Sequence, residues 1–149
     1  MIASVHTPKL AEQLSACGAP VVNVASTLQD NTDFPCVTSD TRAVVSMAIE
    51  HLKQKGLTRI AFCGEPHRRF IDQWTDAYLQ EVQQQAIEPV VYAPRRKLSY
   101  KTPNETHQRE LRHWLERLPK SVGVFGWATH RCRYLAMACT ESGFSVPDE

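Results

Sequence analysis

The chain has 149 residues, and its 42% hydrophobic and 22% charged content is that of a globular domain rather than of a disordered or fibrous chain. Its 17 basic and 16 acidic residues leave a formal net charge of +1, so the composition excludes a general electrostatic attraction to nucleic acid. Five scattered cysteines without a CxxC pair argue against a disulfide framework and a zinc site, and favour reduced thiols in the cytoplasm.

Short apolar runs alternate with amphipathic stretches from the start of the chain, a pattern typical of βαβ units. The first unit is predicted as a strand over residues 2–5, a helix over residues 8–17 and a strand over residues 21–25. A polar loop is expected over residues 28–34. The second strand is expected to be buried on both faces, because its apolar residues form an almost continuous run of Val21, Val22 and Val24.

The next unit begins with a helix predicted over residues 41–55, for which Ser39 or Asp40 is expected to cap the free backbone N–H groups. Gly56 is expected to end this helix in the left-handed conformation. A buried strand is predicted over residues 60–64. The apolar face of the helix comprises Val44, Val45, Ala48, Ile49 and Leu52.

Two more helices and another strand are predicted in the second half of the chain. A helix that ends near residue 85 follows the loop over residues 65–69, and a strand is expected over residues 89–92. Thr102 is expected to cap the following helix in a capping box with Glu105. The apolar residues that these helices direct toward the sheet are Ile71, Trp74, Tyr78, Val82, Leu111, Trp114 or Leu115, and Leu118.

A strand over residues 122–127, and a helix capped by Thr129 that ends near Ser142, complete the pattern. The alternation predicts an α/β fold in which helices cover both faces of a parallel sheet in three layers. Because the chain starts directly at a strand and another strand is expected after the last helix, we expect the fold to be incomplete at both ends.

Ligands of open parallel sheets bind beyond the carboxyl ends of the strands, where helix N-termini and loop side chains meet. That rule selects four segments here, namely residues 6–7, 39–40, 65–72 and 127–131. The last segment contains an indole, a hydroxyl, an imidazole and a guanidinium group, which together suit the faces and hydroxyls of a sugar.

Each of these segments also has a purely structural interpretation that the sequence leaves open. Trp127 can belong to the core, with Thr129 as a helix cap and Arg131 in a solvated first turn. The basic stretch over residues 67–70 can be an exposed turn rather than a loop that contacts a ligand. Asp40 is explained by helix capping, although it can face a cleft as well.

Several kinds of site have no counterpart in the sequence. The histidines lack an HExxH or other metal-ligand spacing, so no metal site is predicted. No GxGxxG, GxxxxGK[ST] or GxSxG motif occurs, so neither a cofactor nor a catalytic site is predicted. Cys63 and Cys132 are expected to pack on apolar faces. No apolar run approaches the roughly 20 residues of a membrane span.

Residues 37–40, 48–52 and 55–62 resemble the corresponding region of lactose-repressor-type effector domains, which have the type I periplasmic-binding-protein fold. Later parts of the chain resemble more specifically the xylose operon regulatory proteins, in which an AraC-type DNA-binding domain follows the effector domain. These parts are residues 114–119 and 122–125, Arg131, Arg133, Cys139 and Val146-Pro147.

The resemblance implies that residues 1–38 are a partial N-terminal lobe and residues 39–149 most of the C-terminal lobe of an effector domain, and that two such lobes close on a small molecule. Members of this family commonly carry an acid or an amide at the position of Thr129, so this chain departs from them where it would anchor sugar hydroxyls. The ligand-binding residues that the resemblance implies are Asp40, Arg69, Phe70, Trp127, Thr129 and Arg131.

The expected function is therefore non-enzymatic. A pentose such as xylose would bind in the cleft between the lobes and shift the conformation of a cytoplasmic homodimer, which would contact DNA only through a segment outside this chain. Two alternatives stay open, a solute-binding protein for sugar uptake and a small α/β sugar-processing enzyme. The enzyme would need a paired acid and base, and only Glu65 with Asp72 offers such a pair.

Overall fold

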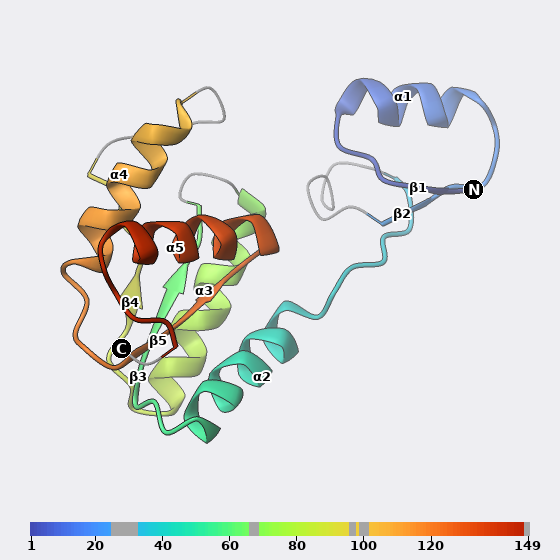
Figure 1. Ribbon diagram of the computed structural model, residues 1–149. Coiled ribbons are helices and arrows are strands. Elements are labelled where there is room, and N and C mark those ends of the chain that lie inside the picture. Colours follow the sequence, from blue (N-terminus) through green and yellow to red (C-terminus); the bar gives the residue numbers. More distant parts are fainter. Residues whose placement is uncertain (25–32, 66–68, 96–97, 99–101, 148–149) are drawn as a thin grey trace. The chain divides into compact units, whose positions relative to one another are not determined.

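The computed structural model describes residues 1–24, 33–65, 69–95, 98 and 102–147, which form two compact units, Met1–Asp40 and Thr41–Glu149 (Figure 1). Most of the predicted polar loop over residues 28–34 lies outside the described residues. The ligand-binding residues predicted from sequence fall in both units, and most of them fall in the second.

The first unit is a small parallel βαβ arrangement. Its elements are β1 (Ile2–Ala3), α1 (Pro8–Ala16) and β2 (Val22–Asn23), and β1 pairs with β2 in parallel. The Thr7 hydroxyl caps α1 by accepting from the Leu10 backbone N–H, at 3.3 Å. A predicted strand–helix–strand unit is thus confirmed, with strands shorter than expected.

A polar residue occupies the centre of this unit, where the sequence predicted only apolar burial. Asn23 is fully buried, and its Oδ1 accepts from the Val5 backbone N–H at 3.1 Å. Val24 is 46% exposed, so the prediction of a strand buried on both faces is wrong at this position. The reason is the alternation of side chains along a strand, which turns Val24 away from the face that buries Asn23.

The second unit contains a three-stranded parallel sheet with the order β4-β3-β5. The strands are β3 (Arg59–Cys63), β4 (Val90–Val91) and β5 (Val122–Gly126). The central strand β3 is buried from Ile60 to Cys63, which is typical of a parallel strand covered on both faces. The buried strand predicted over residues 60–64 is confirmed, and it lies at the centre of this parallel sheet.

Four helices cover the two faces of this sheet in three layers, as the sequence predicts. Helices α2 (Thr41–Gln54) and α3 (Arg69–Gln84) pack on one face, and α4 (Asn104–Leu115) and α5 (Thr129–Glu141) pack on the other (Figure 1). Val44, expected on the core face of α2, is 40% exposed, because the face that meets the sheet is centred on Val45 and Ile49.

The face under α2 and α3 is an aromatic core with its polar atoms paired. The rings of Phe62 and Tyr78 stack with their centroids 5.7 Å apart. The Tyr78 hydroxyl donates to the Ile60 carbonyl at 2.7 Å and accepts from the Val90 backbone N–H at 2.9 Å. A single side chain of α3 thereby ties β3 to β4 from above the sheet.

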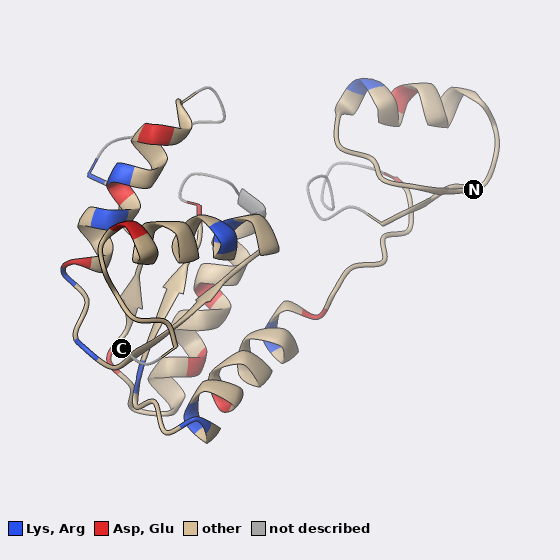
Figure 2. Cartoon of the chain, viewed as in Figure 1, with Lys and Arg blue, Asp and Glu red and all other residues tan. Residues whose placement is uncertain are grey.

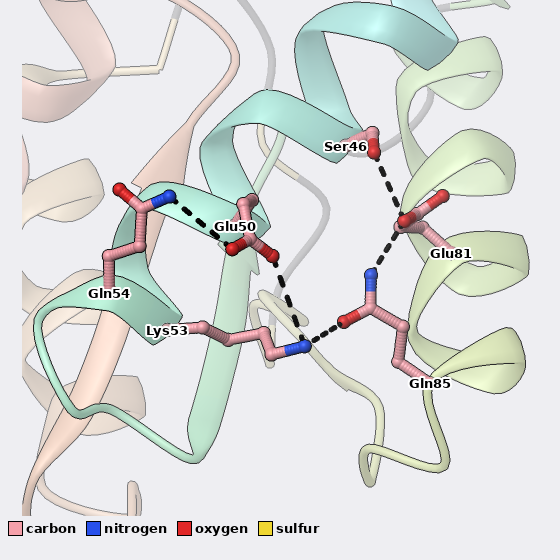
Figure 3. Close-up of polar contacts among 6 residues, drawn as sticks. All are labelled: Ser46, Glu50, Lys53, Gln54, Glu81 and Gln85. Atoms are coloured by element: carbon pink, nitrogen blue, oxygen red, sulfur yellow. Dashed lines mark hydrogen bonds and ion pairs between the residues drawn. The ribbon is translucent and has the colours of Figure 1, made fainter.

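A network of exposed and half-buried polar residues adds to the contact between α2 and α3 (Figure 3). The Glu81 carboxylate accepts from the Ser46 hydroxyl at 3.2 Å and from the Gln85 amide at 2.6 Å. Lys53 donates to the Gln85 amide oxygen at 2.9 Å. These contacts join α2 to α3 through polar side chains.

The side-chain caps predicted at Thr102 and Thr129 are wrong. Helix α4 begins after Pro103, whose ψ of 143° is extended, so that Pro103 is the N-cap and Thr102 lies one residue before it. Helix α5 has Ala128 as its N-cap, and Thr129 is its first helical residue. Neither cap residue forms a side-chain capping hydrogen bond. The hydroxyl of Thr129 is therefore not committed to capping.

Candidate functional site

The three strand ends of the second unit bring polar residues to one edge of the sheet. Because β3, β4 and β5 are parallel, their carboxyl ends lie at the same edge. Tyr92 and Trp127 directly follow β4 and β5, and Glu65 lies two residues after the end of β3. The first turn of α5 adds Arg131 to this edge, where its guanidinium meets Glu65 and Tyr92. We refer to Glu65, Tyr92, Trp127 and Arg131 as the edge cluster.

Arg131 is the most unusual member of the edge cluster, because it is 3% exposed although it carries a full charge. Its Nη2 lies 3.8 Å from the Glu65 carboxylate, which is longer than a hydrogen bond. Its Nε and Nη1 are buried and have no hydrogen-bond partner. Burying a guanidinium is costly unless acceptors meet its N–H groups, so the buried Nε and Nη1 make Arg131 a candidate for contact with a ligand.

Tyr92 forms the surface on which this guanidinium lies. The guanidinium carbon of Arg131 is 5.7 Å from the centre of the Tyr92 ring, a cation–π distance. The same ring meets Trp114 edge-on, with centroids 5.4 Å apart. The Tyr92 hydroxyl is buried without a hydrogen-bond partner, and burial raises the pKa of its phenol well above the usual range. It therefore remains a neutral donor at physiological pH.

The two cysteines near this edge differ in exposure. Cys63 is fully buried, and burial raises the pKa of its thiol to about 12 although the charge of Arg131 acts in the opposite direction. Cys132 is exposed, so the prediction that it packs on an apolar face is wrong. Its position follows from the helix, because residue 132 is one step around α5 from the buried Arg131.

Trp127 and Thr129 lie between the end of β5 and the first turn of α5. Trp127 is half-buried and packs against the core under α2 and α3, and its indole meets the imidazole of His130 edge-on with centroids 5.1 Å apart. Thr129 and His130 are exposed. The partial burial of Trp127 is compatible with both of its interpretations, as a core residue and as an aromatic surface for a ligand.

The remaining predicted ligand-binding residues are not joined to the edge cluster by described contacts. Arg69 and Phe70 open α3, which places their backbone after β3, and their side chains lie outside what the structure describes. Asp40 is exposed and belongs to the first unit. These three residues stay predictions. Arg131, in contrast, is buried, so its interpretation as a solvated helix start is wrong.

Sequence reasoning missed Glu65 and Tyr92 as members of the site. The sequence places Glu65 in the candidate segment over residues 65–72 and in an acid–base pair with Asp72, which is exposed on α3, but not among the ligand-binding residues. Tyr92 was considered only as the end of a strand. Ligands of parallel sheets bind beyond the carboxyl ends of all the strands. The rule that selected Trp127 after β5 therefore also selects Tyr92 after β4.

A separate cavity of about 310 Å³ lies beside β5 and contains none of the edge cluster. Its lining is largely apolar and offers a sugar few hydrogen-bond partners. Side chains from several elements contribute to it, among them Leu52, Leu57, Val122, Leu135, Cys139 and Phe144. We therefore assign the candidate site to the edge cluster rather than to this cavity.

Neither a metal site nor a membrane span emerges from the described part of the chain. Within those residues, no group of three or more His, Cys, Asp or Glu side chains is placed to hold a metal ion. No helix among them is both long and apolar enough to cross a bilayer. Basic and acidic residues are interspersed along the helices (Figure 2).

Comparison with known proteins identifies the family to which the chain belongs. Residues 49–149 match the model of the periplasmic binding protein-like domain, and the chain is a member of that family. Over its whole length it is 28% identical to the xylose operon regulatory proteins of Haemophilus influenzae and Escherichia coli. It spans 40% and 39% of their respective lengths.

Solved structures agree with this assignment. A xylose-binding transcription activator superposes with a TM-score of 0.83 at 27% identity, over 99% of this chain and 40% of that one. A LacI-family regulator from Enterococcus faecium with bound ribose has a TM-score of 0.70 at 15% identity, over 99% of this chain and 54% of that one. The predicted fold and the resemblance to xylose operon regulatory proteins are confirmed.

Proposed function

We propose that this chain is the sugar-sensing part of a cytoplasmic bacterial transcription regulator, and that its ligand is a pentose such as xylose. The role is non-enzymatic, because binding alone shifts the balance between two conformations of the regulator. Residues 1–38 and 39–149 then correspond to parts of its N-terminal and C-terminal lobes. The regulator acts as a homodimer and contacts DNA through a segment outside this chain.

The observation that carries this proposal is the buried Arg131. Two of its nitrogens have no hydrogen-bond partner, and the guanidinium lies at the edge where parallel sheets bind ligands. A guanidinium fork suits adjacent hydroxyl oxygens, which only need to accept. Trp127, whose ring is half-buried, offers an aromatic face of the kind that covers the C–H surface of a sugar.

Calorimetric titration of the native gene product that contains this chain, with xylose and related pentoses, tests the proposal. Arg131→Ala should weaken binding by about 1 to 3 kcal/mol, because a ligand hydroxyl loses a charged donor. Arg133→Ala is the matched control, since Arg133 is exposed on the same helix. Trp127→Ala and Arg69→Ala should also weaken binding. Equal affinity of all variants and the unchanged protein would remove these residues from the site.

Thermal melts of the same variants separate a binding role from a structural one. Trp127→Ala should retain most of the melting temperature if the accessible part of the ring serves the ligand. A collapse of the melting temperature would instead assign Trp127 to the core with which it packs. Binding of Thr129→Ala should fall less than that of Arg131→Ala, because a neutral hydroxyl forms weaker hydrogen bonds than a guanidinium.

The absence of DNA recognition by the chain itself is a separate part of the proposal. The near-neutral charge and the interspersed signs in Figure 2 provide no basic stripe within the described residues. A gel-shift experiment with the isolated chain should show no sequence-selective complex. Tight, selective binding by this chain alone would overturn the assignment of DNA contact to another segment.

A further inference from the structure

The ring of Tyr92 is fixed at the edge of the sheet both by its backbone and by its neighbours. The Tyr92 backbone N–H donates to the Phe62 carbonyl at 2.8 Å, which continues the pairing of β4 with β3. The ring is buried and meets Trp114 edge-on, with centroids 5.4 Å apart. Because a tyrosine side chain has few rotatable bonds, this packing also fixes the direction of its hydroxyl.

The hydroxyl of Tyr92 is a buried polar group that has no hydrogen-bond partner among the described residues. Burial raises the pKa of the phenol well above its usual range, so the hydroxyl stays neutral and can both donate and accept a hydrogen bond. Leaving such a group unpaired costs free energy. A ligand that pairs with it recovers this cost and thereby gains affinity.

Arg131 lies over the same ring but is less constrained than the tyrosine. Its guanidinium carbon is 5.7 Å from the centre of the Tyr92 ring. Its Nε and Nη1 have no hydrogen-bond partner among the described residues, and its Nη2 lies 3.8 Å from the Glu65 carboxylate, beyond hydrogen-bond range. The guanidinium can therefore turn toward a ligand without giving up a hydrogen bond of Nε or Nη1.

We propose that the Tyr92 hydroxyl binds the ligand directly and determines which sugar the site accepts, by pairing with one ligand hydroxyl while Arg131 pairs with another. This inference rests on the proposed sugar-sensing function. The ligand reaches the hydroxyl once the Arg131 guanidinium has turned from the ring toward it. A sugar that lacks the matching hydroxyl, or carries it in the opposite configuration, leaves the phenol buried and unpaired, and is therefore rejected.

Calorimetric titration of the native gene product and its Tyr92→Phe variant with a panel of aldopentoses tests this role. Tyr92→Phe removes the hydroxyl and retains the ring over which Arg131 lies. It should weaken binding of the tightest pentose by about 3- to 10-fold, because one neutral hydrogen bond is lost. The control is Tyr134→Phe, since Tyr134 is a half-buried tyrosine of α5 outside the edge cluster. This control should bind with unchanged affinity.

Monodeoxy analogues of the tightest pentose show whether the lost hydrogen bond is one to the ligand. The unchanged protein should discriminate against the analogue that lacks the hydroxyl facing Tyr92. Tyr92→Phe should bind this analogue and the parent pentose about equally, because neither then has a partner to lose. The thermal melt of Tyr92→Phe should match that of the unchanged protein, since no hydrogen bond within the described part of the chain is removed.

Three results would overturn the inference while the sugar-sensing function stands. The first is an unchanged affinity of Tyr92→Phe for the parent pentose, which would mean that the hydroxyl does not meet the ligand. The second is the same loss of affinity for the parent and for every analogue, and the third is an early melt of the variant; both would assign the hydroxyl a structural role. If the unchanged protein binds none of the pentoses, the proposed function itself fails, and this inference fails with it.

Discussion

Two buried tyrosines, one above each face of the sheet, show how differently the two halves of the second unit use the same side chain. The Tyr78 hydroxyl on the α2 and α3 side donates to one strand and accepts from another. The Tyr92 hydroxyl on the α4 and α5 side is buried without a partner, and a guanidinium lies over its ring. Proteins pair most buried polar groups, so the unpaired side is where function is to be sought.

The same contrast extends beyond the tyrosines. Both polar atoms of the Gln108 side chain on α4 and the Ser142 hydroxyl at the end of α5 are buried without hydrogen-bond partners, as are two nitrogens of Arg131. On the other side, the Glu81 network of Figure 3 joins α2 to α3 through paired groups. Most of the buried side-chain atoms that lack a hydrogen-bond partner among the described residues therefore lie on the α4 and α5 side of the sheet.

The largest loss of stability should come from removing the Tyr78 hydroxyl, which is paired with two strands. Tyr78→Phe leaves the Ile60 carbonyl and the Val90 N–H without a partner inside the core, and should lower the free energy of unfolding by about 2 to 4 kcal/mol. Chemical denaturation monitored by circular dichroism measures this change.

Tyr92→Phe is the matched substitution on the other face. It removes a hydroxyl that has no partner, so stability should stay within about 0.5 kcal/mol of the unchanged protein or rise slightly. Equal losses for Tyr78→Phe and Tyr92→Phe would break the comparison between the two faces.

An intermediate loss of stability is expected from a substitution at Gly126, where α5 meets the end of β5. A Cβ added at Gly126 would lie 2.9 Å from Cys132 Sγ, which is closer than such atoms approach. Gly126→Ala should therefore destabilise by about 1 to 3 kcal/mol. Because the nearest obstacle is one sulfur, the double variant Gly126→Ala with Cys132→Ala should recover most of the loss in thermal melts. A strictly additive double variant would contradict this packing.

The smallest effect should come from the exposed ion pair that joins α4 to α5. Arg112 Nη1 and the Glu141 carboxylate are 2.6 Å apart, with side chains 38% and 44% exposed. Arg112→Ala should cost no more than about 1 kcal/mol, and the cost should shrink in high salt. A larger loss of stability that persists in high salt would show that this ion pair contributes more to the packing of α4 against α5 than an exposed pair should.

Much of the fold could be predicted because burial and periodicity are local properties of the chain. The central strand from Ile60 to Cys63, the buried face of α3 and the glycine at the end of α2 all follow from residue spacing. Helix caps were harder to predict from the sequence. Whether Pro103 is the N-cap or the first helical residue depends on one backbone angle.

The candidate site was predicted less completely, because it depends on contacts between distant residues. Trp127 and Arg131 were found from their position after a strand. That Arg131 is buried, however, follows from its meeting Tyr92 and Glu65, which are 39 and 66 positions away in the sequence. Neither composition nor residue spacing indicates that these three residues are in contact. The contact depends on the register in which β3, β4 and β5 pair.

The exposure of Cys132 gives the protein a natural attachment point for a fluorescent label. Its thiol lies in the same turn of α5 as Arg131, whereas the Cys63 thiol is buried and largely un-ionised, which protects it from alkylation. With the exposed Cys17 and Cys36 of the first unit and the half-buried Cys139 of α5 replaced by serine, a maleimide dye on Cys132 would report from the edge of the site. Its emission would then follow ligand occupancy without any engineered cysteine.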